Sequence, residues 1–357
     1  MRQDTGMLRR ALPVLVTTLL VTLAVPVIGR PAATLPASLT DREFWTLIGQ
    51  LSEPNGYFVS RSGSPDNLLS NEMQISTVAA ALATQVAPSG VYLGVGPEQN
   101  FTYIAAMKPR IAFITDIRRG NLDVHLLYKA LFEMSATRSE LVARLFSRKP
   151  AAKLTRTASA AQLMAAYDGA APVDPATFEA NLKAVLDLLT SKHGYELTAD
   201  DRSGIEHAYR AYYQFGPAIN YTSSINGGTG RFNNYAALMA SVDSRSGDER
   251  TYLASEENFA FVKGMESRNL IVPVVGNFAG PTALRAIGAW LKARGATVSA
   301  FYVSNVEQYL EQSGVWPAFC ANVATLPLDA SSIFIRPNRG SSSFAPIARE
   351  TAACPRR

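Results

Sequence analysis

The feature that most constrains the fold is an alternation of short apolar runs with helical stripes between residues 91 and 134. The first run ends in Gly94-Val95-Gly96, and Pro97 follows at a position that suits the first turn of a helix. Apolar residues then recur at helical spacing, next in an unbroken run, and then at helical spacing again. This order predicts a parallel sheet with helical crossovers. The elements are expected at residues 91–96, 98–107, 111–116 and 121–134.

The same alternation returns near the C-terminus. A strand is expected over residues 270–276, although Pro273 cannot donate a ladder hydrogen bond. A helix follows, with Pro281 near its start and Gly295 in the position of a C-cap. The remaining elements are expected at 297–303 (strand), 306–312 (helix) and 332–336 (a last, edge strand).

The middle of the chain, about 137–265, has a different pattern, because helical stripes alternate with polar turns and no strand signal. Helices are expected at 138–147, 158–168, 175–190, 199–214, 233–242 and 255–268. Residues 216–232 are rich in Gly, Ser, Asn and Thr, which indicates a loop. We therefore predict an α/β domain over 39–345. It would have a Rossmann-like, mostly parallel sheet with flanking helices, a long helical insertion between its two halves, and a tail at 346–357.

The N-terminus has the composition of an export segment. No charged residue occurs between Ala11 and Ile28, Arg9 and Arg10 precede this run, and small residues follow it. The run is long for a signal peptide and just long enough to span a bilayer. A cleaved signal and a retained membrane anchor over residues 1–38 are therefore both open. The positive flank predicts an exported domain that is periplasmic or membrane-anchored facing the periplasm.

Composition excludes several classes of function. The net charge is +5 and no interior block of Lys or Arg occurs, so a nucleic-acid partner is not expected. The three histidines are scattered without metal-ligand spacing, so no metal site is expected. Cys320 and Cys354 are the two cysteines, which either form a disulfide in an oxidising compartment or remain free thiols.

The first strand–helix turn is the strongest candidate for a binding site. Its glycines allow a sharp turn and a close approach of a ligand to the backbone, beside unpaired N–H groups of the helix. Asp116 closes the next strand about 20 residues further on, where Rossmann-type folds place an acid that binds ribose hydroxyls. A tight turn with a helix-capping aspartate is the alternative. The candidate cofactor-binding residues are Gly94, Gly96, Glu98, Gln99, Asn100 and Asp116.

Polar residues also follow other expected strands, and in open α/β sheets ligands bind at the carboxyl ends of strands. A small-molecule site is therefore expected at this edge. Asn71 and Glu72 could cover it, although Ser70 with these two residues equally suits a helix N-cap. No GxSxG elbow or Walker A sequence occurs. The substrate-side candidates are Asn71, Glu72, Asn277, Tyr302, Ser304, Asn305 and Glu307.

Four blocks carry a family resemblance. They are YLGVGPEQNFTYIAAMKPRIAFITDIRR at 92–119, NLLSNE at 67–72, VPVVGNFAGP at 272–281 and YVSNVEQYL at 302–310. The chain resembles an uncharacterised bacterial family whose core is similar to class I S-adenosylmethionine-dependent methyltransferases. This resemblance implies a Rossmann-like fold, with S-adenosylmethionine held at the Gly94/Gly96 turn and Asp116.

Two functions follow as expectations. The first is a methyltransferase-like enzyme that acts on a small molecule. The second is a non-enzymatic cell-envelope domain that keeps only the scaffold, because Tyr92 stands where methyltransferases usually carry an acid and Glu98 replaces a small residue. Export favours the second, since S-adenosylmethionine is a cytoplasmic metabolite.

Overall fold

The computed structural model describes Met1 and residues 34–60, 63–151, 154–169, 174–223, 232–338, 341–352 and 354. The residues from 34 onwards belong to one folding unit. The predicted export segment at 11–28 lies outside the described residues, as does most of the glycine-rich part of the predicted loop, at 224–231.

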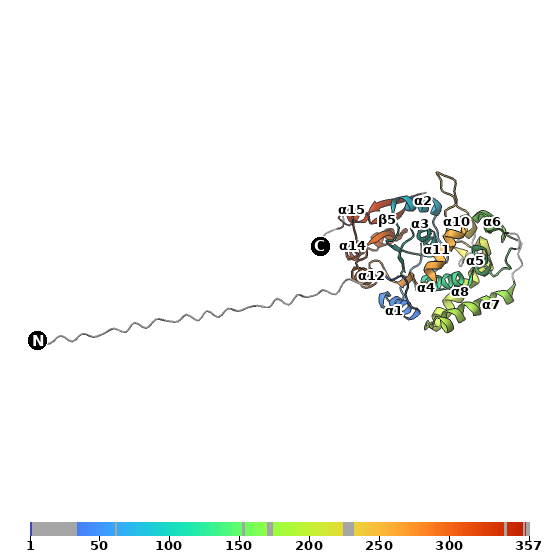
Figure 1. The fold of residues 1–357 in the computed structure, drawn as a ribbon, viewed down its shortest axis with the longest axis horizontal. Coiled ribbons are helices and arrows are strands. Elements are labelled where there is room, and N and C mark those ends of the chain that lie inside the picture. The colour runs from blue at the N-terminus through green and yellow to red at the C-terminus, as the bar shows by residue number, and fades with distance from the viewer. Residues whose placement is uncertain are drawn as a thin grey trace. The chain divides into compact units, whose positions relative to one another are not determined.

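Figure 1 shows the fold, in which helices surround a central sheet. The sheet has six strands in the order β3-β2-β1-β4-β5-β6. The first five strands in this order run parallel to one another, and β6 pairs antiparallel with β5. The strands are β1 (Val91–Gly94), β2 (Ile111–Asp116), β3 (Ile271–Val275), β4 (Val298–Tyr302), β5 (Ile333–Asn338) and β6 (Ser341–Pro346). The expectation of a mixed α/β fold with a mostly parallel sheet is confirmed.

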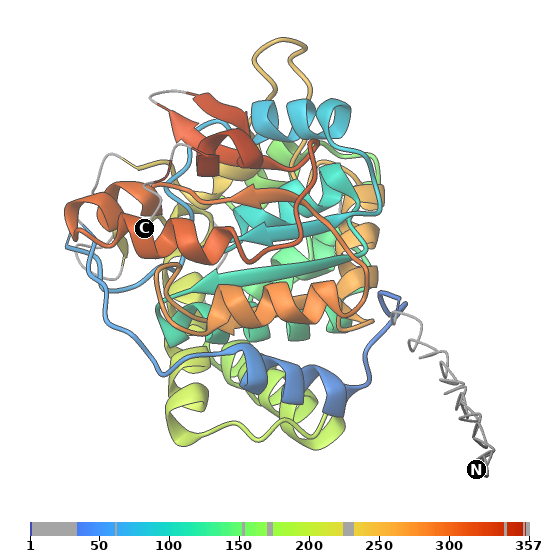
Figure 2. The ribbon, with the colours of Figure 1, turned by 90° about the vertical axis from the view of Figure 1, so that its left-hand side faces the viewer.

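Helices cover both faces of the sheet (Figure 2). One face carries α1 (Asp41–Leu51), α12 (Ala283–Lys292), α13 (Val306–Gln312) and α14 (Trp316–Val323). The opposite face carries α2 (Ile75–Gln85), α3 (Gln99–Met107), α4 (Arg119–Met134) and α11 (Glu256–Glu266). Further helices between β2 and β3 are α5 (Arg138–Leu145), α6 (Ala160–Ala165), α7 (Pro175–Asp187), α8 (Ala199–Phe215) and α10 (Tyr235–Met239), with η1 (Leu188–Lys192) and η2 (Gly216–Ala218); α15 (Ile347–Ala352) follows β6.

Burial on both faces explains the composition of the strands. Every residue of β1, β2 and β3 is buried, so these strands consist mainly of consecutive apolar residues and do not alternate with polar ones. Tyr92 pairs with Ala112 on one side and Ala300 on the other, so β1 and β4 are neighbours although about two hundred residues separate them. The chain thus leaves β1 in one direction across the sheet and returns at β4 in the other.

Pro273 is accommodated because β3 is an edge strand. The Val275 N–H donates to Ser52 Oγ, and its carbonyl accepts from the Glu53 N–H, so this residue faces away from β2. Backbone groups alternate sides along a strand, which places the Pro273 nitrogen on the same outer side. The missing N–H therefore costs no hydrogen bond to β2.

Two local predictions were wrong. The strand expected at 332–336 is not the edge of the sheet, because β5 pairs with β4 on one side and with β6 on the other. The serine-rich β6 has little intrinsic strand signal, and its pairing with β5 supplies the structure. The helix N-cap suggested at Ser70 is also absent, since α2 begins at Ile75.

Two further findings bear on the predicted environment of the chain. Cys320 on α14 and Cys354 lie at disulfide-bonding distance, with their Cα atoms 6.0 Å apart. This agrees with the disulfide alternative and ties the C-terminal segment to the body of the domain. None of the helices in the described part of the chain is both long and apolar enough to cross a bilayer.

Candidate functional site

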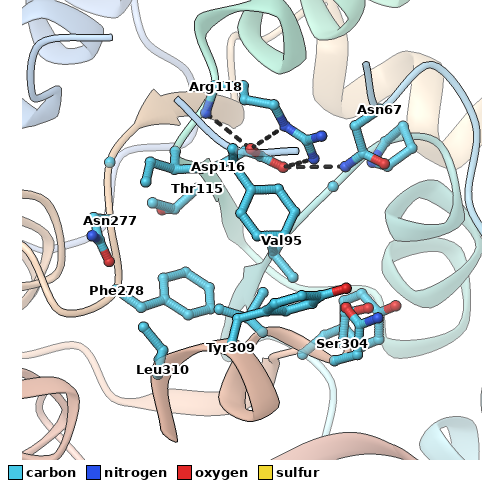
Figure 3. Close-up of a pocket in the computed structure, with 18 of the residues that line it drawn as sticks. Asn67, Val95, Thr115, Asp116, Arg118, Asn277, Phe278, Ser304, Tyr309 and Leu310 are labelled. Carbon is cyan, nitrogen blue, oxygen red and sulfur yellow. Dashed lines mark hydrogen bonds and ion pairs between the residues drawn. The ribbon is translucent and has the colours of Figure 1, made fainter. Parts of the chain in front are cut away.

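A pocket of about 340 Å³ lies at the carboxyl ends of β1, β2, β3 and β4. Its walls come from the strand ends, from the segment before α2 and from α13 (Figure 3). Polar lining residues include Asn67, Asn71, Gly96, Gln99, Asp116, Arg118, Tyr221, Asn277, Tyr302, Ser304 and Asn305. Apolar and aromatic lining residues include Tyr57, Phe58, Val95, Phe278, Val306, Tyr309, Leu310 and Val315.

Side chains in the protein interior hold the turn after β1 in place. Gly96 has a φ of 79°, in the left-handed region that favours glycine. The Asn100 side-chain amide donates to the carbonyls of Val95, Gly96 and Pro97 at 3.0, 3.0 and 2.8 Å. Tyr92 Oη in turn donates to Asn100 Oδ1 at 2.7 Å. Asn100 and Tyr92 therefore build the turn from within the protein and leave its outer surface to the pocket.

His125 also supports this turn. Its Nε2 lies 2.9 Å from the Gly96 carbonyl oxygen, and burial lowers the pKa of the imidazole to about 4. The ring is therefore neutral at physiological pH, and Nε2 carries the proton that it donates to this carbonyl.

Glu98 lies beneath the turn and does not line the pocket. Both of its carboxyl oxygens accept from the Ser70 backbone N–H, at 3.2 and 3.1 Å. Burial raises the pKa of Glu98 to about 8, although hydrogen bonds from backbone N–H groups lower it. Its role is to fasten the segment before α2, which carries Asn71 and Glu72, to the start of α3.

Asp116 at the end of β2 faces the pocket as part of a neutral ion pair. Its Oδ1 accepts from the backbone N–H and Nε of Arg118 at 3.0 and 3.2 Å. Its Oδ2 accepts from Asn67 Nδ2 at 3.1 Å, and Figure 3 shows the three side chains together on one wall. The Arg118 guanidinium lies 5.3 Å from the centre of the Phe58 ring. This wall offers both donors and acceptors without a net charge.

The end of β4 presents two hydroxyl groups. Tyr302 Oη and Ser304 Oγ both donate to Glu72 Oε1, at 2.5 and 3.2 Å. Burial raises the pKa of Glu72, although these two hydrogen bonds lower it. Ser304 has a φ of 48°, which places a non-glycine residue in the left-handed region.

The end of β3 is occupied by the chain's own carboxylate. Glu53 Oε1 accepts from the backbone N–H groups of Thr282 and Ala283 at 2.8 and 2.9 Å. Its Oε2 accepts from the Asn277 N–H at 3.1 Å. The start of α12 thus has an internal anionic partner, which a helix amino end favours. A side chain at Gly280 would clash with this carboxylate.

Aromatic side chains form the opposite wall, and Phe58 joins the two walls because its ring lies against both Arg118 and Tyr309. Phe58 and Tyr309 pack edge to face with ring centres 4.8 Å apart. Figure 3 shows Phe278, Tyr309 and Leu310 on the side of the pocket away from Asp116, with Ser304 beyond Tyr309. The pocket therefore has a polar wall facing an apolar one, which suits an amphipathic small molecule.

Most, but not all, of the predicted site residues come together here. The predicted residues that line the pocket are Asn71, Gly96, Gln99, Asp116, Asn277, Tyr302, Ser304 and Asn305. Gly94, Glu98 and Asn100 do not line it, and Glu72 reaches it only through Tyr302 and Ser304. Glu307 points elsewhere, because both of its oxygens accept from Arg336 on β5, at 2.6 and 2.7 Å.

Several lining residues were missed by sequence reasoning. Asn67 and Phe58 come from a segment without regular structure, whose path over the strand ends has no periodic signal. Tyr221 lies between η2 and α10, and its proximity to Arg118 is a tertiary contact. Within the described ranges, no three His, Cys, Asp or Glu side chains gather as metal ligands would.

Residues 68–352 match the model of a family described as Domain of unknown function (DUF7790). The chain belongs to this family. The DUF7790 match contains all six strands and most of the pocket, while α1 and Glu53 precede it. No curated protein is significantly similar to the chain.

Proposed function

We propose that the pocket binds an uncharged small molecule of nucleoside size that carries neighbouring hydroxyl groups, and that this binding is the function of an exported domain. The observation that carries the proposal is the Asp116–Arg118–Asn67 wall facing the aromatic wall. A hydroxyl group donates and accepts at once, so it can pair with Asp116 and with Arg118 or Asn67 together. The Phe58 and Tyr309 rings suit a flat, less polar part of the same ligand.

The topology supports a Rossmann-like interpretation. The strand order corresponds to the doubly wound order 3-2-1-4-5-6, with the last strand reversed. In such sheets ligands bind where the order reverses, which here is between β1 and β4. We interpret the helices α5 to α11 as an insertion, about residues 137–265, between the two halves of this sheet.

The residues do not fit S-adenosylmethionine, so we derive no methyl-transfer step. An unpaired acid would favour the cationic methionine end of S-adenosylmethionine, but Asp116, the acid among the lining residues, already accepts from Arg118 and Asn67. Tyr92 and Asn100 satisfy each other inside the protein, so the turn offers no acid either. A cationic ligand would also lie beside the Arg118 guanidinium.

An extracytoplasmic location is part of the proposal. It is supported by the positive and apolar segment at 1–38 and by the Cys320–Cys354 pair, since disulfides persist in oxidising compartments. The protein would be periplasmic, or tethered to the membrane through residues 11–28.

Native mass spectrometry of the purified protein tests the proposal first, because a bound ligand adds its mass to the protein. Thermal unfolding should then be measured with adenosine, other nucleosides, uncharged glycosides and S-adenosylmethionine. A ligand at about 100 times its Kd stabilises the fold by about 2.7 kcal/mol. We expect a shift with an uncharged hydroxylated ligand and a smaller one, or none, with S-adenosylmethionine.

Asp116→Asn should remove the ligand-induced shift, since the amide replaces an acceptor by a donor. Asp248→Asn is the matched control, because Asp248 lies on the surface in a pair with Arg250. If nothing co-purifies and no neutral ligand shifts unfolding at millimolar concentration, the binding proposal fails, and the non-enzymatic cell-envelope domain is the function to pursue.

A further inference from the structure

Ser304 differs from the other non-glycine residues with positive φ among those described. Lys108, Ser147 and Asn269 each lie just past the C-terminus of a helix, where a left-handed residue is a common terminator. Ser89 lies in the turn before β1. Ser304 instead follows strand β4, precedes helix α13 and lines the pocket. Strained backbone of this kind concentrates at functional sites.

A strand–turn–helix with a strained serine is a known device for presenting a nucleophile. It holds the serine hydroxyl at the carboxyl edge of the sheet, exposed to the substrate. Such turns usually carry glycines two residues before and two residues after the serine, whereas Tyr302 and Val306 occupy these positions here. The conformation, rather than a sequence motif, therefore reveals the similarity.

The partner of Ser304 is a carboxylate that has the properties of a base. Ser304 Oγ donates to Glu72 Oε1 at 3.2 Å, which is at the limit of the range expected between a nucleophile and its base. The side chains that hydrogen-bond to Glu72 are the hydroxyl groups of Tyr302 and Ser304. No cation in the described part of the chain contributes to the pKa of Glu72. Because burial raises the pKa of Glu72, this carboxylate accepts a proton more readily than an exposed one.

We propose that Ser304 is a nucleophile and Glu72 its general base, and that the pocket cleaves an ester of a small hydroxylated molecule. This activity goes beyond binding and does not depend on the ligand being a nucleoside. Tyr302 is a positioning residue, since its hydroxyl holds the Glu72 oxygen that also accepts from Ser304.

The reaction balances with water as the second reactant. Ser304 Oγ forms a bond to the acyl carbon while its proton moves to Glu72, and the ester C–O bond breaks. Glu72 returns the proton to the departing alkoxide. Water then attacks the acyl carbon and gives a proton to Glu72. The bond between this carbon and Ser304 Oγ breaks, Glu72 returns the proton to Ser304 Oγ, and a carboxylic acid is released. Asn71 and Asn305 line the same pocket and supply polar surroundings for this chemistry.

A fluorophosphonate probe tests the nucleophile without knowledge of the substrate. The purified protein is incubated with the probe, and intact mass and peptide mapping identify the modified residue. We expect one adduct, on Ser304, with a rate that increases with pH as Glu72 loses its proton. Ser304→Ala should not react. Ser331→Ala is the matched control, because Ser331 is exposed in the turn before β5 and does not line the pocket, so its loss should leave the rate unchanged.

Two further variants separate chemistry from folding. Glu72→Gln keeps an acceptor for Tyr302 but not a base, and should slow labelling by about 10²-fold or more. Ser304→Gly should raise the melting temperature, because glycine adopts positive φ without strain, and should abolish labelling. No adduct on the wild-type protein, or an adduct elsewhere, overturns the proposal. Equal rates for wild type and Glu72→Gln overturn the role of Glu72.

Discussion

The buried carboxyl group of Glu98 should make the free energy of unfolding depend on pH. Its carboxyl group is fully buried beneath the turn after β1, and burial raises its pKa from 4.5 to about 8. Below pH 4.5 both the folded and the unfolded chain carry the proton, so the group does not oppose folding. Between pH 4.5 and about 8 only the unfolded chain releases it, and the free energy of unfolding falls as pH rises.

The magnitude follows from about 1.4 kcal/mol per pKa unit. At pH 7 the solution lies about 2.5 units above the unfolded pKa and still below the folded one, so the cost of Glu98 is about 3 kcal/mol. Glu98→Gln keeps an acceptor for the Ser70 N–H and resembles the protonated acid. The variant should therefore be about 3 kcal/mol more stable than wild type at pH 7, and about equally stable at pH 4.5.

Urea unfolding of both proteins from pH 4.5 to 8 measures this difference. Burial also raises the pKa values of Asp123 and Glu266 to about 8, so both the wild-type protein and the Glu98→Gln variant should lose stability as pH rises. The informative quantity is the difference between the two curves. Glu179→Gln, at an exposed position, should change stability by about 0.5 kcal/mol or less at every pH. A Glu98→Gln variant that is less stable at pH 7, or whose difference from wild type is independent of pH, would refute the reasoning.

Two other predictions concern the turn and the C-terminal segment. Gly96→Ala should destabilise the protein by about 1–2 kcal/mol and weaken ligand binding. A residue with a Cβ is strained at a φ of 79°, and this Cβ would press on the Asn67 and Gln99 side chains. Thermal unfolding with and without ligand measures both effects. Cys354→Ser should lower the free energy of unfolding by about 3–4 kcal/mol in oxidising conditions, because the bridge closes a loop with a sequence separation of 34. Treatment with dithiothreitol should lower the stability of the wild-type protein to that of the Cys354→Ser variant. A denaturation midpoint that neither change alters would contradict a stabilising role of the cysteine pair.

Much of the fold could be predicted from local patterns. The strand at Ile111–Asp116 and the helix at Val306–Gln312 have the predicted bounds, because their apolar residues follow one period without interruption. β6 could not be predicted in the same way, since its strand structure comes from pairing with β5 and half of its residues are serine.

The candidate site was predictable only at the level of strand ends. The order of strands and helices brings Asp116, Tyr302 and Ser304 to one edge, and this could be inferred from the sequence. The sequence does not indicate which of two adjacent residues faces the pocket. Glu98 and Gln99 point in different directions at the start of α3, and only Gln99 lines the pocket. Such choices depend on tertiary partners, such as the Ser70 N–H beneath Glu98.

The Glu53 carboxylate has a practical consequence for how this protein is cut and expressed. The region recognised by sequence similarity starts at residue 68, but Glu53 satisfies three N–H groups around the start of α12, and Ser52 and Glu53 cover the outer edge of β3. A fragment starting at 68 would expose an unpaired strand edge, which invites self-association. It would also leave the N–H groups at the start of α12 unpaired, and sulfate or phosphate could bind there and mimic a ligand. Expression boundaries should therefore begin before α1, at about residue 34, and anion binding by shorter fragments should be treated as a product of truncation.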